Sequence, residues 1–103
     1  MIHVIATVEL HDGKRDAFLV EFRKLVPLVR TEEGCLEYAP AVDVDTGLAA
    51  QNPIRADAVM VVEKWENLET LKKHLQAPHM IAYRSKVKDY VKSTKLQVLA
   101  PAD

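Results

Sequence analysis

The sequence predicts an α+β sandwich in which helices cover one face of an antiparallel sheet. Apolar residues recur at every second position near the N-terminus and dominate a Val-rich run in the middle of the chain, which is typical of strands. Between these runs the apolar residues recur at every third or fourth position, which is typical of helices. The resulting order is β-α-β-β-α-β, and the 103 residues suffice for one domain, which we expect to span 1–103.

The N-terminal part contains the first strand and the first helix. Residues 2–10 alternate between apolar and other residues and predict a strand. Asp12 is a plausible N-cap for the next helix, because its carboxylate can accept hydrogen bonds from the first unpaired amides. Pro27 predicts a kink or a short second segment in this helix, and Gly34 suits the left-handed residue that ends it. The apolar stripe of the helix consists of Phe18, Phe22, Leu25 and Val29.

The next region predicts a second strand and the longest loop. Residues 35–44 can form a strand, and Pro40 requires an edge position or a distortion there. Residues 43–55 contain Gly, Asp, Asn and Pro and few periodic apolar residues, so they predict a loop. Loops of this length often cover binding sites. The residues expected on one side of the strand are Leu36, Tyr38 and Val42.

The C-terminal half repeats the order of strand, helix and strand. Residues 58–65 predict a strand that is apolar on both faces until Glu63 and Lys64. Asn67 can cap the next helix, and Pro78 suits the first turn of a further helical segment. The stripe of the first segment is Leu68, Leu71 and Leu75, with His74 beside it. The stripe of the second is Met80, Tyr83, Val87, Tyr90 and Val91, and the last short strand contains Leu96, Val98 and Ala100.

This order is that of a ferredoxin-like sandwich, and it leaves the second face of the sheet uncovered. Two helices can cover only one side of four strands, whereas the first and third strands are apolar on both sides. An exposed apolar face favours packing against another copy of the chain. We therefore expect a homodimer that pairs the two sheets.

Composition and charge narrow the classes of function. With 49% hydrophobic residues, 28% charged residues and a net charge of −1, the chain is typical of a globular protein rather than a nucleic-acid-binding one. No apolar run approaches the roughly 20 residues that span a membrane, and Met1 leads into a strand-like run instead of a secretory signal. The single Cys35 cannot form an internal disulfide. We expect a cytoplasmic protein that binds neither nucleic acid nor membrane.

The sequence contains no motif for a standard cofactor. It has no glycine-rich phosphate loop, no cysteine-rich metal spacing and no nucleophile elbow. His74 and His79 lie five residues apart with Pro78 between them, which breaks the four-residue spacing that presents two imidazoles on one helix turn. We expect neither a cofactor nor a metal.

Titratable and aromatic side chains on neighbouring elements predict a small apolar pocket with few polar groups. His74 is a candidate general base because an imidazole titrates near neutral pH, and the alternative is a half-exposed helix histidine. Trp65 either stacks on a flat ligand or fills the core. Tyr38 either donates to a ligand oxygen or leaves its hydroxyl in water. The full set is Tyr38, Glu63, Trp65, His74, His79 and Tyr83.

Three sequence blocks carry a resemblance to a known family. They are Glu33-Gly34-Cys35-Leu36-Glu37-Tyr38, then Val62-Glu63-Lys64-Trp65-Glu66-Asn67, then Leu71-Lys72-Lys73-His74-Leu75 followed by Pro78-His79. In this order and spacing the chain resembles the antibiotic biosynthesis monooxygenase family, particularly its quinol-monooxygenase-like branch. The resemblance covers nearly the whole chain.

The resemblance implies a dimeric ferredoxin-like protein with a ligand cavity between the sheet and the helices of each protomer. Members oxidise phenolic or quinol-type substrates with molecular oxygen and without flavin, haem or metal. On this basis His74 is the expected base, with Tyr38 and His79 as donors to the substrate oxygen. Trp65 and Tyr83 are the expected walls against the ring. Glu63 either orients one of the histidines or faces solvent.

Two other functions remain open at this point, and Thr7 argues against a third, haem degradation. A related branch isomerises small phosphorylated hydroxy-ketones linked to quorum-signal breakdown, and Arg55 and Lys64 are candidate phosphate ligands for it. Another branch degrades haem and uses an asparagine on the first strand, where this chain has Thr7. A small dimeric module that binds an aromatic metabolite without turning it over fits the same fold.

Overall fold

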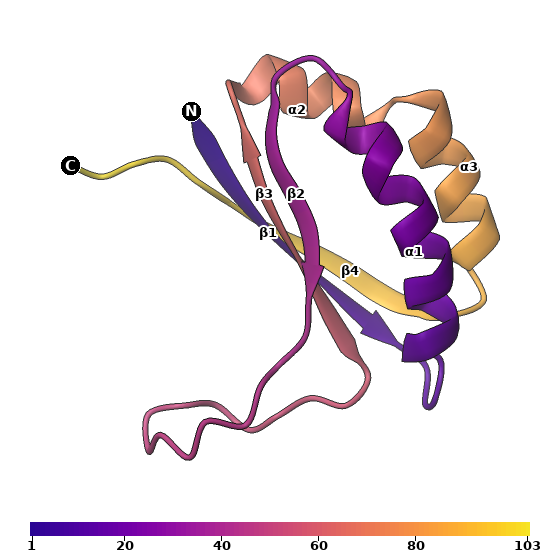
Figure 1. Cartoon of the computed structure of the whole chain (residues 1–103), viewed down its shortest axis with the longest axis vertical. Helices are drawn as coiled ribbons and strands as arrows, with labels where there is room; N and C mark the ends of the chain where they lie inside the picture. Colours follow the sequence, from indigo (N-terminus) through magenta and orange to yellow (C-terminus); the bar gives the residue numbers. More distant parts are fainter.

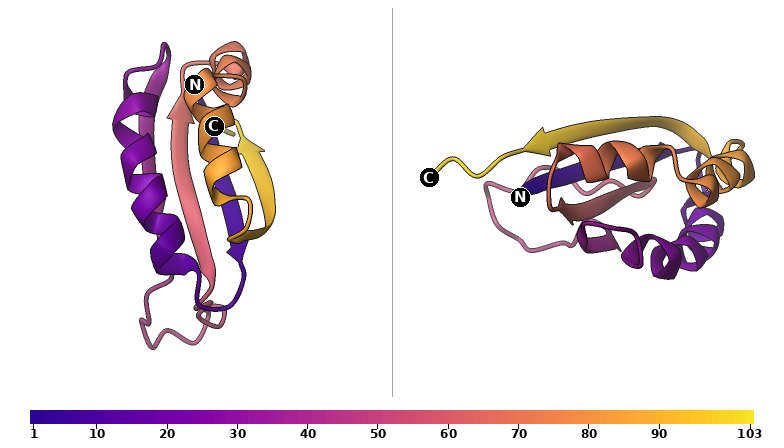
Figure 2. Two further views of the ribbon diagram at one scale, coloured as in Figure 1. Left: turned by 90° about the vertical axis from the view of Figure 1, so that its right-hand side faces the viewer. Right: turned by 90° about the horizontal axis from the view of Figure 1, so that it is seen from above.

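The computed structural model describes residues 1–103 and has two layers, with helices packed on one face of a four-stranded sheet (Figures 1 and 2). The strand order is β2-β3-β1-β4, and each neighbouring pair is antiparallel. The predicted ferredoxin-like order is confirmed, with the second helical region divided into α2 and α3. The elements are β1 (Ile2–Leu10), α1 (Arg15–Arg30), β2 (Cys35–Ala41), β3 (Ala58–Trp65), α2 (Leu68–Leu75), α3 (Pro78–Val87) and β4 (Val91–Leu99).

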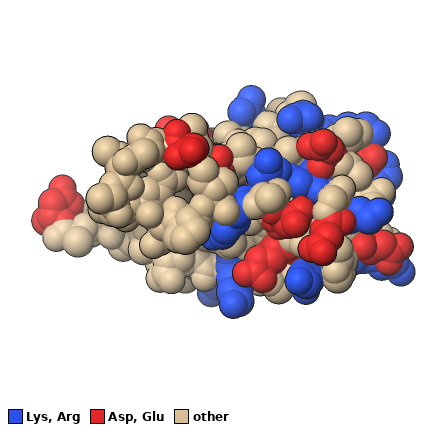
Figure 3. Space-filling view, turned by 90° about the horizontal axis from the view of Figure 1, so that it is seen from below, with Lys and Arg blue, Asp and Glu red and all other residues tan.

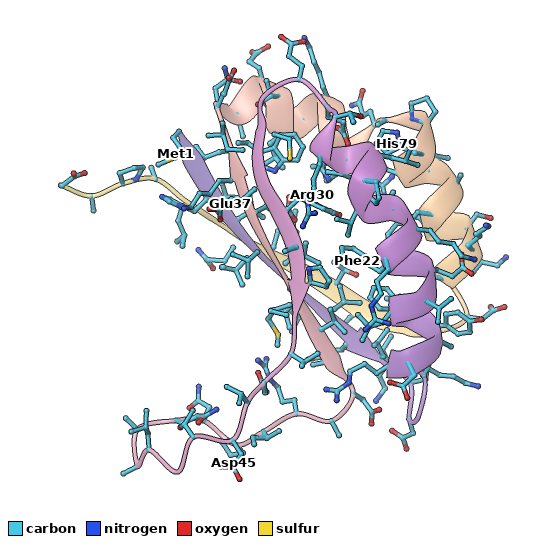
Figure 4. All side chains as sticks on the ribbon, in the orientation of Figure 1. Met1, Phe22, Arg30, Glu37, Asp45 and His79 are labelled. Atoms are coloured by element: carbon cyan, nitrogen blue, oxygen red, sulfur yellow. The ribbon has the colours of Figure 1, made fainter.

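The core lies between the sheet and the helices. Alternation in β1 and β3 turns every second side chain toward the helices, and α1 contributes its apolar stripe from the opposite side. Phe22 points from α1 toward the sheet (Figure 4) and stacks on Tyr38 with 5.6 Å between the ring centroids. The fully buried large side chains include Trp65, Phe18, Phe22 and His74.

The first helix differs from the prediction at its start and in having no separate second segment after Pro27. Asp12 does not cap α1, because the turn continues to Lys14, which occupies the N-cap position without a side-chain bond. Gly13 extends this turn with a φ of 74°, and its amide donates to Asp57. Pro27 does not divide the helix, which continues to Arg30. The ring lies on the exposed side, where water can bind the carbonyl that proline leaves unpaired.

The residues around Gly34 differ partly from expectation. Gly34 has the predicted left-handed conformation, with a φ of 80°, but it lies in the turn before β2 and does not end α1. Pro40 lies on an edge strand, as predicted. The pairing of β2 with β3 shifts register between Cys35 and Glu37, so Leu36 is 50% exposed and does not share the buried side of Tyr38. Val42 lies beyond the strand.

The C-terminal strand is longer than predicted. The helical stripe was expected to include Tyr90 and Val91, but α3 ends at Val87 and Val91 begins β4. Tyr90 lies in the turn, where its amide donates to the carbonyl of Val87. The first half of β4 is polar because this strand is at the edge of the sheet, so its residues do not show an apolar alternation.

The loop between β2 and β3 projects away from the two layers (Figure 1). Its base is closed by Arg55, whose Nε donates to Asp43 at 2.9 Å and whose Nη2 donates to the other carboxylate oxygen at 3.0 Å. Figure 3 shows that the projecting part carries few charges. Its exposed apolar side chains are Val42, Val44, Leu48 and Ile54. The loop was predicted, but none of its residues lines the central cavity described below.

The face of the sheet away from the helices is open. Val62 is 37% exposed and Leu99 is 43% exposed on this face, and Ile5 lies between their strands. Glu37 points away from the helices (Figure 4) and accepts a hydrogen bond from Lys64.

The three helices are too short or too polar to span a membrane.

Candidate active site

A cavity of about 300 Å³ lies between the sheet and the helices. Most of its wall is apolar, and a few polar groups converge on it, which is the usual composition of a small-molecule site. Tyr83, Arg84 and Thr94 also line a surface pocket, so the cavity opens between α3 and β4. The wall consists of Ala6, Val8, Phe22, Tyr38, Val61, Glu63, His74, Leu75, Met80, Tyr83, Arg84, Thr94 and Leu96.

His74 reaches this cavity from α2. Asn67 begins the helix with a capping box, in which its side chain accepts from the amide of Thr70 at 2.9 Å. The helix then turns Leu71 and His74 inward. The His74 side chain is 2% exposed and is held between aromatic rings, 4.6 Å from Trp65 and 5.3 Å from Tyr38 between ring centroids. Packing therefore fixes the orientation of the imidazole.

Glu32 accepts a hydrogen bond from each of two histidines. Its Oε2 lies 2.9 Å from Nδ1 of His74 and 2.7 Å from Nε2 of His79. Burial lowers the pKa of His74, and the bond with Glu32 opposes this effect. The second ring nitrogen of His74, Nε2, has no hydrogen-bond partner in the protein. His74 lines the cavity, so Nε2 is the ring nitrogen that the protein leaves free for a ligand there.

Sequence reasoning missed Glu32. It lies in the turn after α1, where the run Glu32-Glu33-Gly34 indicated only the end of the helix. The signal in retrospect is Gly34, because a side chain there would collide with Thr70 at the start of α2. The turn is thus packed against α2, and this contact brings Glu32 beside His74.

Glu63 and Trp65 form a buried pair on β3. The indole Nε1 of Trp65 donates to Oε1 of Glu63 at 2.9 Å. Burial raises the pKa of Glu63 to about 7, with the Trp65 bond opposing and the charge of Glu32 adding to the rise. Glu63 was expected to orient a histidine or face solvent; the second expectation is wrong, because Glu63 is 5% exposed, and the hydrogen bond that the structure shows is to Trp65.

Trp65 fills the core and does not contact the cavity. Its side chain is completely buried and packs on His74, and it is absent from the cavity wall. The expected stacking of a substrate on Trp65 is therefore not supported by the structure. Trp65, at the end of β3, instead packs against the imidazole of His74.

Tyr38 and Tyr83 lie on the cavity wall, where they were expected to meet a ligand. Burial raises the pKa of Tyr38, and the nearby charge of Glu63 adds to this effect. Burial also raises the pKa of Tyr83, with Arg84 opposing it. Both phenols therefore remain protonated at neutral pH and can donate hydrogen bonds.

His79 lies outside the cavity. It occupies the first turn of α3, next to the end of α1 (Figure 4), and faces a surface groove between these helices. Its expected role as a donor to a substrate oxygen does not fit this position, because Nε2 is bonded to Glu32. No group of three or more His, Cys, Asp or Glu side chains is arranged to hold a metal ion.

Arg84 is a second residue of the cavity wall that sequence reasoning missed. Its guanidinium donates to the carbonyl of Leu75, which ties α3 to the end of α2 at the opening. The two basic residues considered as phosphate ligands do not converge on the cavity. Arg55 pairs with Asp43 at the loop, and Lys64 pairs with Glu37 on the open face of the sheet. The two residues proposed as phosphate ligands for the isomerase alternative therefore lie away from the cavity.

Comparison with known proteins agrees with this architecture. The solved structures of PA3566 from Pseudomonas aeruginosa and Rv0793 from Mycobacterium tuberculosis both superpose with a TM-score of 0.80, at 22% and 23% sequence identity. The alignments cover 99% of this chain in both cases, with 94% of the first relative and 95% of the second. These two likenesses support the fold.

A curated relative is closer in sequence. The chain is 41% identical over 103 residues to the probable quinol monooxygenase YgiN of Escherichia coli K12, and the alignment covers 98% of both chains. The family model described as antibiotic biosynthesis monooxygenase matches residues 1–86, which include every element from β1 to α2 and nearly all of α3. The chain therefore belongs to the antibiotic biosynthesis monooxygenase family.

Proposed function

We propose that this protein is a cofactor-independent monooxygenase that oxidises a small phenolic or quinol-type aromatic with molecular oxygen. The observation that carries the proposal is His74 on the wall of a mostly apolar cavity, with Nδ1 bonded to Glu32, Nε2 without a protein partner, and two protonated tyrosines beside it. The name of the curated relative, a probable quinol monooxygenase, supports the same class of substrate.

Three residues of the cavity wall, His74, Tyr38 and Tyr83, have roles in the proposed reaction. His74 takes the proton of a substrate hydroxyl at Nε2, and the resulting anion is electron-rich enough to reduce oxygen directly. One oxygen atom enters the ring to give a hydroxyquinone, and the other leaves as water. Tyr38 and Tyr83 donate hydrogen bonds to the charged oxygen as it forms, in a cavity with a mostly apolar wall. A well-placed base of this kind contributes roughly 10²–10⁴ to the rate.

The cavity volume sets the size of the substrate. A cavity of about 150 Å³ accommodates benzene. The cavity in this protein has about twice that volume, which suits a hydroquinone of one or two rings. Arg84 at the opening places a positive charge where an anionic substituent or the substrate anion itself would enter.

The open face of the sheet supports a homodimer as part of the proposal. The exposed Val62 and Leu99 lie on a face that no helix covers. Pairing two sheets through this face would remove apolar surface from water and close a barrel, while leaving both cavities on the outer sides.

Oxygen uptake tests the proposed function. The purified protein is incubated with hydroquinones of one and two rings in an oxygen electrode, and products formed under ¹⁸O₂ are examined by mass spectrometry. We expect uptake above the rate without protein and one labelled oxygen per product molecule. Binding of the quinol without uptake would support the non-catalytic module instead, and the absence of both would overturn the proposal.

A further inference from the structure

Glu32 joins the imidazole in the cavity to a histidine near the surface. One carboxylate oxygen, Oε2, bonds to both rings, at 2.9 Å for His74 and 2.7 Å for His79. The exposed fraction of the side chain rises outward, from 2% for His74 through 13% for Glu32 to 25% for His79. The three side chains therefore form a continuous hydrogen-bonded row from the cavity wall to the groove between α1 and α3.

The chemistry of a carboxylate determines which nitrogen of His74 carries the proton. An ionised carboxylate can only accept hydrogen bonds, so Nδ1 of His74 must donate to Oε2. A neutral imidazole has one N–H, and Nε2 then carries a lone pair. His74 lines the cavity and Nε2 has no protein partner, so this lone pair is the one that a bound ligand could meet.

We propose that Glu32 is the positioning residue of the active site: it selects the tautomer of His74 in which Nε2 can accept the substrate proton. His79 holds the same carboxylate from the outer side and keeps it directed at Nδ1. The inference rests on the base role of His74 proposed above.

The backbone around Glu32 is fixed independently of the histidines. Its amide donates to the carbonyl of Val29 at 2.9 Å, and its carbonyl accepts from Cys35 at 3.2 Å. The amide of Glu66 donates to the carbonyl of Gly34 at 2.9 Å, which ties the turn to the end of β3. A carboxylate on a turn held in this way is placed before any substrate binds, as positioning requires.

The charges around His74 show what removing Glu32 would do. Burial lowers the pKa of His74, and the charges of His79 and Arg84 on α3 lower it further. Glu32 is the group that raises it. The rings that contact His74 from β2 and β3, Tyr38 and Trp65, are uncharged, and Glu63 on β3 is the other carboxyl that lines the cavity. Without the carboxylate, His74 becomes a weaker base and has no acceptor that holds the proton on Nδ1.

Long-range ¹H–¹⁵N NMR of protein labelled at histidine reads the tautomer directly, without any activity assay. We expect His74 to carry its proton on Nδ1 in the wild type at neutral pH. In Glu32→Gln the population with the proton on Nε2 should increase, because an amide can donate to Nδ1. Glu32→Asp should keep part of the wild-type tautomer. The matched control is Glu33→Gln, whose side chain is 78% exposed and which should leave the spectrum of His74 unchanged.

Turnover of a quinol gives the second reading. Glu32→Gln should lose about 10–100-fold in kcat, by analogy with the loss when the carboxylate partner of a metal-bound histidine is removed, and Glu32→Asp should recover part of the loss. A wild-type spectrum with the proton of His74 on Nε2 would overturn the inference, even if Glu32→Gln failed to fold. A wild-type protein without quinol turnover would overturn the proposed function. The tautomer of His74 would still show whether Glu32 holds the proton on Nδ1.

Discussion

Because Glu63 is buried, we predict that the stability of the protein depends on pH and that Glu63→Gln removes this dependence. Burial raises its pKa from 4.5 to about 7. A carboxyl with a higher pKa in the folded protein holds its proton more tightly there, so its contribution to stability is complete below pH 4.5 and is lost as the pH rises to about 7. At about 1.4 kcal/mol per pH unit, the loss amounts to about 3 kcal/mol.

Glu63→Gln isolates this effect. The amide oxygen can still accept from Trp65, and the side chain no longer titrates. The free energy of unfolding of the wild type should fall by about 3 kcal/mol more than that of the variant between pH 4.5 and pH 8. Urea unfolding between these pH values measures the difference.

Two comparisons make the result specific. Burial lowers the pKa of His74, so its contribution to the stability of the protein changes in the opposite direction and is lost as the pH falls below 6.5. Its contribution cancels in the difference because both proteins contain it. Glu33→Gln, on an exposed side chain, should follow the wild type at every pH. A difference between Glu63→Gln and wild type that stays constant with pH would refute the assigned burial of the charge.

Other predictions concern the scaffold. Gly34→Ala should lower the free energy of unfolding by about 2–5 kcal/mol, because the left-handed backbone costs alanine about 1–2 kcal/mol and the new Cβ would lie 2.5–2.7 Å from Thr70 atoms. Gly47→Ala is the control in urea unfolding and should lose only the backbone part, since its surroundings are open. Asn67→Ala removes the cap of α2 and should cost about 1 kcal/mol in the same assay. Val62→Glu places a charge on the open sheet face, and sedimentation should show a monomeric variant beside the dimer proposed for the wild type; a dimeric variant would contradict pairing through this face.

The elements that the sequence predicts correctly are those set by local periodicity. Alternation in residues 2–10 and 58–65 gives strands within a residue of those observed, because one face of each is buried against the helices. The failures occur where distant contacts decide. The turn around Asp12 is extended by a bond to Asp57, and the polar start of β4 becomes a strand only because it pairs with β1.

The candidate site shows the same division. His74 and Tyr83 are predictable because an apolar helical stripe places its neighbours toward the core. Glu32 is not predictable in this way, because it lies 42 residues from His74 and 47 from His79. Trp65 could not be assigned from the sequence, since core packing and ligand stacking require the same ring. In the structure Trp65 is completely buried and packs on His74, so it is a core residue.

The role of His74 as the base is the central claim, and oxygen uptake by His74→Gln tests it most directly. The amide can still donate to Glu32, so the variant removes the accepting Nε2 with little change in packing. With a quinol that the wild type oxidises, we predict a loss of at least about 100-fold in kcat, while His11→Gln, on an exposed turn, keeps the wild-type rate. A His74→Gln variant that consumes oxygen at the wild-type rate would contradict the claim.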